Sequence, residues 1–239
     1  MSGGTVASLV SAGAGKLGIV IPNGSEILFE RYFELLEKYG QNVNLTAISG
    51  EGDVAGLHFL DSIAISKVAS FSNKRVIDVG SGAGFPGIPL KLIEPTIDLT
   101  VLDASGKRVN FLKTLCRDLE IDVECVQERA EEASKTPELR EKFDIAVSRA
   151  VARLNILCEL CLPYVKTGGL FLAMKGAEAD REAEEAENAI EKLGAAIENN
   201  YYYEIPGKNI NHKAIVIRKV KSTPDEYPRR YAKIKKNPL

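Results

Sequence analysis

Residues 76–87 have the sequence VIDVGSGAGFPG, which carries the strongest structural pattern in the chain. A short apolar run comes first, and glycines follow at positions 80, 82, 84 and 87. An amphipathic helical pattern begins directly after them. Glycines between a strand and a helix let the backbone turn tightly and approach a ligand closely. The stretch therefore predicts a nucleotide-binding turn rather than a plain connection.

Strand and helix patterns alternate on both sides of this turn. We expect strands at 75–80, 98–103, 122–127, 143–148 and 168–176. Helices are expected at 86–94, 106–119, 152–165 and 178–194, with a polar helix or loop at 129–142. Two last strands, 197–205 and 212–220, flank the turn sequence PGKN. This order predicts an α/β protein with a doubly wound, mostly parallel sheet of seven strands and an antiparallel edge.

The region before residue 70 has a different character. Residues 1–20 are rich in Gly, Ala and Ser, which predicts a loose arm or a short helix. Helical spacing at 25–39 ends at Gly40, a plausible stop, and 58–68 predicts another short helix. We therefore expect a small helical N-terminal cap at 1–70 and a main domain at 71–239.

Composition narrows the class of protein. The chain has 239 residues, 45% hydrophobic and 27% charged, which is typical of a globular protein and excludes wholesale disorder. No uncharged apolar run reaches the roughly 18–20 residues that span a bilayer, and the opening lacks the basic region of a secretory signal. Four cysteines in a chain of this size favour a reducing compartment. We expect a cytoplasmic monomer without a membrane partner, in which Cys158 and Cys161 are buried core thiols.

Positive charge is concentrated at the C-terminus. Residues 207–239 hold ten Lys or Arg against two acidic residues, although the whole chain has a net charge of −2. Such a run is either a solvated tail or a surface for nucleic-acid phosphates, and the interleaved Tyr227 and Tyr231 favour the second. The predicted RNA-binding residues are Arg229, Arg230, Lys233, Lys235 and Lys236. Because Pro228 and the charge density disfavour burial, we expect the tail to contact RNA and not to affect cofactor binding.

Two cofactors are compatible with the glycine turn. Asp103 ends the next strand, where a carboxylate accepts hydrogen bonds from both ribose hydroxyls of NAD or of S-adenosylmethionine. Asp78 suits the amino group of a methionine moiety and would repel a pyrophosphate. The terminal hairpin is typical of methyltransferase sheets, an analogy at the level of the fold. S-adenosylmethionine is therefore favoured over NAD.

Two alternative functions remain open at this point. An NAD-dependent oxidoreductase would need a catalytic acid or base in the second half, such as a Tyr-x-x-x-Lys pair, and none is suitably placed. A non-catalytic RNA-binding protein on a methyltransferase scaffold would keep the basic tail and lose the cofactor loop. The intact Asp78, Gly80, Gly82 and Gly84 argue against that loss.

Several motifs together resemble the ribosomal RNA small subunit methyltransferase G family. They are NLTAI (44–48), HFLDSI (58–63), DVGSGAGFPGIPLKL (78–92), RAEE (129–132), SRAVA (148–152), FLAMKG (171–176) and the final KKNPL. The resemblance implies a class I, Rossmann-like methyltransferase with S-adenosylmethionine as cofactor. It further implies methyl transfer to N7 of a guanine in the decoding-region loop of 16S ribosomal RNA, so that 16S RNA or the small ribosomal subunit is the partner.

The resemblance also implies roles for individual residues. Ala130 and Glu131 would lie beside the adenine, and Arg149 would lie near the methionine end or the incoming base. The expected cofactor contacts are Asp78, Gly80, Gly82, Gly84, Phe85, Asp103, Ala104, Ser105, Ala130, Glu131 and Arg149. The expected catalytic residues are Arg149, which would position the reactants, and Lys175, which would contact RNA phosphate. The tail departs from the family pattern, with Tyr231-Ala-Lys-Ile234 in place of Pro-Gly-x-Pro.

The implied chemistry places few demands on side chains. Guanine N7 carries a lone pair and no proton, so methyl transfer needs no general base, and near-attack positioning supplies most of the acceleration. The sequence has neither the Asn/Asp-Pro-Pro-aromatic motif of amino-directed methyltransferases nor a Pro-Cys nucleophile. His58 and Asp61 are expected to form local hydrogen bonds rather than a catalytic pair.

Overall fold

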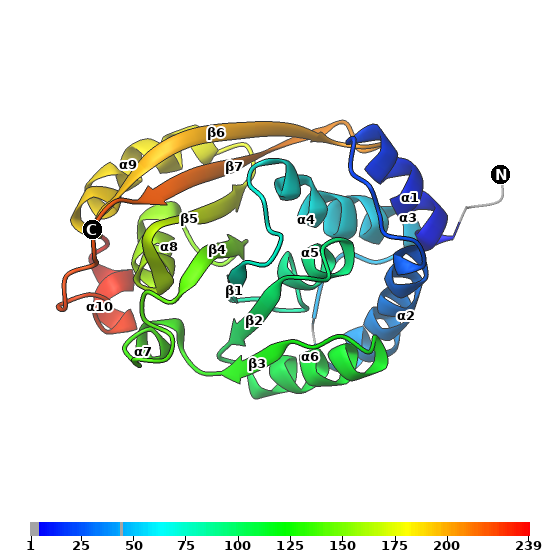
Figure 1. The fold of residues 1–239 in the computed structure, drawn as a ribbon, viewed down its shortest axis with the longest axis horizontal. Coiled ribbons are helices and arrows are strands. Elements are labelled where there is room, and N and C mark those ends of the chain that lie inside the picture. The colour runs from blue at the N-terminus through cyan, green and yellow to red at the C-terminus, as the bar shows by residue number, and fades with distance from the viewer. Residues whose placement is uncertain (1–4, 44) are drawn as a thin grey trace.

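The computed structural model describes residues 5–43 and 45–239 (Figure 1). Residues 1–4 of the expected N-terminal arm, and Asn44 at the start of the motif NLTAI, lie outside the described residues. Among the helices of the described part, none combines the length and the apolarity needed to cross a membrane.

One seven-stranded sheet organises the molecule, as the sequence predicted. Its strands are β1 (Arg75–Val79), β2 (Asp98–Asp103), β3 (Glu124–Gln127), β4 (Phe143–Arg149), β5 (Val165–Lys175), β6 (Ala195–Ile205) and β7 (Ile210–Lys219). Their order is β3-β2-β1-β4-β5-β7-β6, with parallel pairing from β3 to β5. The hairpin of β6 and β7 adds the antiparallel part, with β7 paired to β5 and β6 at the edge.

Helices cover both faces of this sheet because its central strands β1, β2 and β4 are buried on both sides. One face is covered by α5 (Gly87–Ile93), α6 (Gly106–Asp118) and the N-terminal helices. The other carries α7 (Ala130–Ala133), α8 (Leu154–Cys161) with the short helix η3 (Leu162–Tyr164), and α9 (Ala179–Lys192). Side chains alternate accordingly, so that Val76 packs into the first core and Ile77 into the second.

The N-terminal region is helical throughout most of its length. Its elements are α1 (Val6–Lys16), α2 (Ser25–Val43), α3 (Glu51–Asp53), η1 (Val54–Leu60), α4 (Asp61–Ala64) and η2 (Ile65–Lys67). The expected stop at Gly40 is wrong, because α2 continues to Val43, and a glycine inside a helix lowers its stability without ending it. Phe29 and Phe59 share one core with the sheet residues Val101 and Val147, so the boundary near residue 70 stays a prediction.

The C-terminal tail is a packed element and ends in α10 (Tyr231–Lys236). This helix lies beside α7 and α8, at the end of the molecule opposite α1 and α2 (Figure 1). Ile234 is fully buried in the second core, and no local pattern marks that burial, because a single Ile stands among four cations. The expectation that the tail is too charged to pack against the domain is therefore wrong.

The sheet positions the site through its strand order. The chain leaves β1 toward β2 and returns to β4 on the other side, so β1 and β4 form the switch point where open α/β sheets bind ligands. The glycine turn follows β1 there, Asp103 ends β2 and Arg149 ends β4.

Candidate functional site

The glycine turn adopts backbone angles that favour glycine over other residue types. Gly82 has φ +62° and Gly84 has φ +104°, both in the left-handed region that favours glycine. A Cβ on Gly84 would collide with the Tyr32 hydroxyl and with Ile88. A Cβ on Gly82 would meet only the Gly80 carbonyl, at 3.9 Å. Gly84 is thus required by the protein's own packing, whereas Gly82 faces open space.

Asp78 holds the turn from behind. Its Oδ2 accepts hydrogen bonds from the Gly87 amide at 2.8 Å and from the Ser81 hydroxyl at 2.9 Å. Burial raises the pKa of Asp78 to about 6, although these bonds oppose the rise. The other oxygen, Oδ1, is buried and has no partner among the described residues. Asp78 shapes the turn and does not line the cavity in front of it.

A cavity of about 420 Å³ opens in front of the turn. Eight of the expected cofactor residues line it: Gly80, Gly82, Phe85, Asp103, Ala104, Ala130, Glu131 and Arg149. Asp78, Gly84 and Ser105 were also expected to contact the cofactor, but they are not in its wall. The volume lies within the range of pockets that enclose small ligands.

Asp103 is oriented by backbone amides at the edge of this cavity. Its Oδ1 accepts a hydrogen bond from Ser105 N at 2.8 Å, and its Oδ2 accepts one from Gly82 N at 3.1 Å. Arg108 lies 3.5 Å from the same Oδ2 and is itself partly exposed. Because a carboxylate has about four acceptor positions and these contacts use three, Asp103 retains one on Oδ1 for a ligand hydroxyl group.

Phe85 joins the turn to the N-terminal helices. Its ring stacks on Tyr32, with centroids 5.3 Å apart, and on His58, with centroids 4.3 Å apart. The guanidinium of Arg149 lies 5.0 Å from the same ring. The Tyr32 hydroxyl donates a hydrogen bond to the Ala83 carbonyl at 2.5 Å, so α2 contacts the turn directly. The cap therefore supports the cavity wall.

Arg149 is the centre of a buried polar network. Its Nη1 donates to Asp61 Oδ2 at 2.8 Å and to the Leu57 carbonyl at 3.0 Å, and its Nη2 donates to His58 Nδ1 at 3.0 Å. These bonds connect the end of β4 with η1 and α4. Contacts with the cap thus position Arg149. Its guanidinium has more N–H groups than these three bonds use.

His58 is neutral in this network. Burial lowers its pKa to about 3, and the charge of Arg149 acts in the same direction. Because Arg149 only donates, Nδ1 of His58 accepts, and its Nε2 donates to the Thr46 hydroxyl oxygen at 2.6 Å. That oxygen also accepts from the Ile48 amide at 3.0 Å, so the Thr46 hydroxyl hydrogen is available to the cavity that Thr46 lines.

Asp61 is the counter-ion of the network and is only 1% exposed. Its Oδ1 lies 2.8 Å from the Tyr203 hydroxyl, which donates, and 2.8 Å from His212 Nδ1. Burial alone would raise the pKa of Asp61, but the hydrogen bond from His212 and the charge of Arg149 together hold it below its ordinary value. Asp61 is therefore a carboxylate whose partners come from β4, β6 and β7.

A second cavity of about 690 Å³ adjoins the first. The two share His58, Arg149, Ala150 and Val151 in their walls. Ala150 has φ +56°, an uncommon conformation for a residue with a Cβ, and such strain is typical of functional sites. Val151 exposes 41% of its surface on this ridge. The ridge at 149–151 thus separates two spaces that can hold two reactants.

Lys175 lines the second cavity but is largely enclosed. Its side chain is 8% exposed, lies 2.8 Å from Glu182 and donates to the Ala152 carbonyl at 2.6 Å. Through these contacts it connects the end of β5 with α9 and with the segment that follows the ridge. This placement does not support the expected phosphate contact, because Lys175 is already paired and covered.

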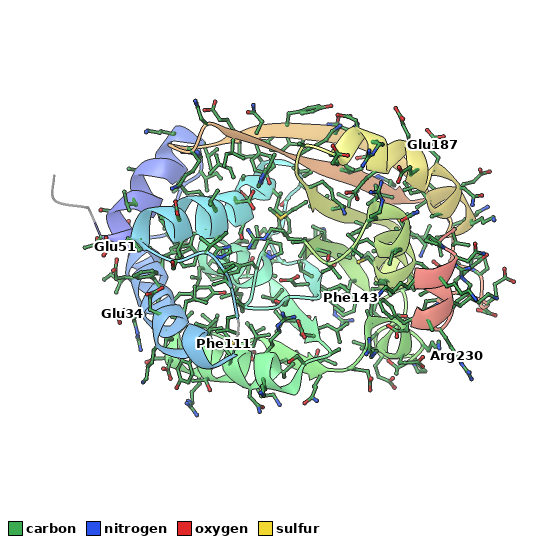
Figure 2. All side chains as sticks on the ribbon, turned by 180° about the vertical axis from the view of Figure 1, so that it is seen from behind. Glu34, Glu51, Phe111, Phe143, Glu187 and Arg230 are labelled. Atoms are coloured by element: carbon green, nitrogen blue, oxygen red, sulfur yellow. The ribbon has the colours of Figure 1, made fainter. Side chains whose placement is uncertain are left out.

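Of the five cations predicted to bind RNA, one is largely covered and four are exposed. Arg229 is 12% exposed and binds Glu159 of α8, a carboxylate with no exposed surface. The Nε–Oε1 distance is 2.9 Å and the Nη2–Oε2 distance is 2.6 Å. Its expected role in RNA binding conflicts with that pairing. Arg230, Lys233, Lys235 and Lys236 are exposed, and Figure 2 shows Arg230 at the outer edge beside α10.

Sequence reasoning missed several residues of the site. Thr46, Val151, Tyr203, His212 and Tyr231 were not assigned to it, and Asp61 was assigned only local bonds. The motif HFLDSI was the available signal for His58 and Asp61, whereas nothing local marks Tyr203 or His212. Cys158 and Cys161 are buried as expected, and burial raises the pKa of both thiols. Within residues 5–43 and 45–239, no cluster of His, Cys, Asp and Glu is arranged to hold a metal ion.

Comparisons with known proteins agree with the motifs. A family model described as "GidB: rRNA small subunit methyltransferase G" matches residues 26–210. A protein named ribosomal RNA small subunit methyltransferase G from Caldanaerobacter subterraneus subsp. tengcongensis is 45% identical over 229 residues, 95% of each chain. Another of that name from Alkaliphilus oremlandii is 42% identical over 233 residues, 97% of this chain and 98% of its own.

A solved structure confirms the fold. P. horikoshii TYW2 in complex with MeSAdo superposes with a TM-score of 0.54, covering 69% of this chain and 63% of its own. Its sequence identity to this chain is 17%, so the likeness concerns the fold alone. The predicted Rossmann-like class of the sheet is thus confirmed.

Proposed function

This chain belongs to the rRNA small subunit methyltransferase G family, and from that premise we propose that it methylates N7 of a guanine in the decoding-region loop of 16S ribosomal RNA. It is a methyltransferase that uses S-adenosylmethionine. The observation that carries the finer proposal is the pair of adjoining cavities separated by Arg149, Ala150 and Val151.

The first cavity fits the cofactor. Asp103 has an acceptor position left on Oδ1 for a ribose hydroxyl, and the open side of Gly82 leaves room that a Cβ would fill. Glu131 and Ala130 line the end of the cavity beyond β3 and would lie beside the adenine. When bound, S-adenosylmethionine supplies an electrophilic methyl group on a sulfonium. The residues of this chain hold and orient it at the ridge.

The second cavity would receive the guanine. Its walls contain the carboxylates of Asp61 and Glu182, each paired with a cation, and the exposed apolar side chain of Val151. Arg149, Arg153 and Lys175 line the same cavity, so the carboxylates balance these cations, and the apolar face of Val151 suits a flat base. Arg149 would position the base through the N–H groups that the network leaves free, and no residue needs to remove a proton. Near-attack positioning then supplies the rate acceleration.

The exposed cations of the tail are proposed to contact RNA phosphates. Arg230, Lys233, Lys235 and Lys236 lie on one short segment, and clustered cations bind RNA by displacing its counterions. The partner is thus proposed to be 16S RNA or the small ribosomal subunit. We further propose that the protein acts in the cytoplasm as a monomer.

Calorimetric titration with S-adenosylhomocysteine and with NAD tests the cofactor assignment. We expect one binding site for S-adenosylhomocysteine and no heat of binding for NAD, because the chain belongs to a methyltransferase family. Binding of NAD alone would favour an oxidoreductase. Binding of neither would favour an RNA-binding protein without catalysis.

A further inference from the structure

Tyr231 of the C-terminal tail lies in the wall of the first cavity. It is the first residue of α10, and its ring is 5.5 Å from the guanidinium carbon of Arg129. Arg129 follows β3 closely, and Glu128 and Ala130 line the same end of the cavity. A segment more than 100 residues away in the sequence therefore completes the wall beyond β3.

The position of Tyr231 is fixed by buried contacts on both sides of it. Before it, Glu159 of α8 accepts hydrogen bonds from the Arg229 amide at 2.7 Å and from its guanidinium. After it, Ile234 is fully buried in the core around α8. Because Glu159 has no exposed surface, loss of Arg229 would leave a buried carboxylate unpaired. The tail is therefore held against the domain as part of its structure.

The cavity has two distinct ends, and Tyr231 lies at the one away from the ridge. The glycine turn and Arg149 mark one end, and the residues after β3 mark the other. Asp103 lies between them at the end of β2, the strand that separates β1 from β3. A nucleoside cofactor with its ribose at Asp103 and its reactive group at Arg149 must place its base beside Ala130 and Tyr231.

We propose that Tyr231 forms one wall of the adenine subsite, so that the tail contributes to cofactor binding as well as to RNA binding. This inference rests on the proposed function, since it presupposes an adenosyl cofactor in the first cavity. A phenol ring offers a flat apolar face to a purine, and aromatic contacts of this kind contribute substantially to base binding. This proposal differs from the sequence-based expectation that the tail leaves cofactor affinity unchanged.

Three variants test the assignment by titration with S-adenosylhomocysteine and with adenosine. We expect Tyr231→Ala to raise both dissociation constants about tenfold, because both ligands carry the base. Tyr231→Phe keeps the ring and should stay within about twofold of the unmodified protein. Tyr202→Ala is the matched control, since Tyr202 is an exposed tyrosine on β6 outside both cavities, and it should change neither constant.

The melting temperature of each variant separates binding from folding. A Tyr231→Ala protein that melts normally and binds both ligands as tightly as the unmodified chain would overturn the assignment. Equal weakening in Tyr231→Phe and Tyr231→Ala would also overturn it, because the hydroxyl rather than the ring would then be responsible. If the unmodified chain fails to bind S-adenosylhomocysteine, the proposed function itself fails, and this result is distinct from the other two.

Discussion

A Gly82→Asn variant is expected to lose S-adenosylhomocysteine binding while keeping its fold. Apart from its chain neighbours, no protein atom lies closer to the new Cβ than the Gly80 carbonyl at 3.9 Å, and Gly82 lines the first cavity, which the side chain would occupy. Asn also tolerates the left-handed conformation at φ +62° better than other residues. We expect affinity to fall on the order of a hundredfold or more, about 2.7 kcal/mol or greater, in a calorimetric titration.

Gly168→Asn is the matched control for this substitution. Gly168 has φ +85°, and no atom lies within 4 Å of the place that a Cβ would take there. It therefore has similar backbone strain on β5 and lies outside both cavities. Its variant should bind S-adenosylhomocysteine normally. A folded Gly82→Asn protein with the affinity of the unmodified chain would show that the cofactor does not approach the glycine turn.

The second large effect is expected on stability, from Asp61→Ala. This substitution leaves the buried Arg149 without its counter-ion and removes the acceptor of Tyr203 and His212. Truncating one member of a buried ion pair costs about 3–5 kcal/mol, which lowers the melting temperature of a chain this long by on the order of 10 °C. Denaturant unfolding and thermal melting at pH 7 both measure the loss.

The pH of that measurement follows from the pKa of Asp61. The pKa is lowered in the folded chain, so the stability that the charged carboxylate contributes is present above its unfolded value of about 3.9. It is lost as the pH falls through the lower folded pKa. At pH 7 the contribution is therefore complete, and the variant lacks all of it.

Asp53→Ala provides the comparison for Asp61→Ala. Asp53 lies in the same N-terminal region and pairs with Lys208, but its side chain is 57% exposed. Exposed ion pairs contribute about 0–1 kcal/mol, so this variant should unfold almost like the unmodified chain. Equal losses of stability in both variants would contradict the view that Asp61 is the buried counter-ion of Arg149.

The parts of the fold that depend on local patterns were predictable from the sequence. The glycine turn, the strand that ends at Asp103 and the final hairpin follow from the spacing of apolar and turn residues over a few positions. Arg149 was placed correctly at a strand end, since carboxyl ends of parallel strands meet at the switch point. For the same reason, most of the expected cofactor residues line a single cavity.

The polar network was not predictable, because its members are far apart in the chain. Asp61 meets Tyr203 and His212 across 142 and 151 residues, and a local pattern carries no information on such pairs. Glu159 and Arg229 are a second case of this kind. In the sequence each has the appearance of an ordinary surface charge, and they are covered only because they pair across 70 residues. Tail packing and the placement of Tyr231 depend on that pair.

Methyl transfer to RNA is the decisive measurement for methylation at guanine N7. Small ribosomal subunits whose 16S RNA lacks the modification would be incubated with the protein and labelled S-adenosylmethionine, and the RNA then cleaved by borohydride and aniline, which break the chain at N7-methylguanosine. We predict label in 16S RNA and a single new cleavage at a guanine of the decoding-region loop. Absence of label, or label without cleavage at a guanine, would contradict methylation at N7.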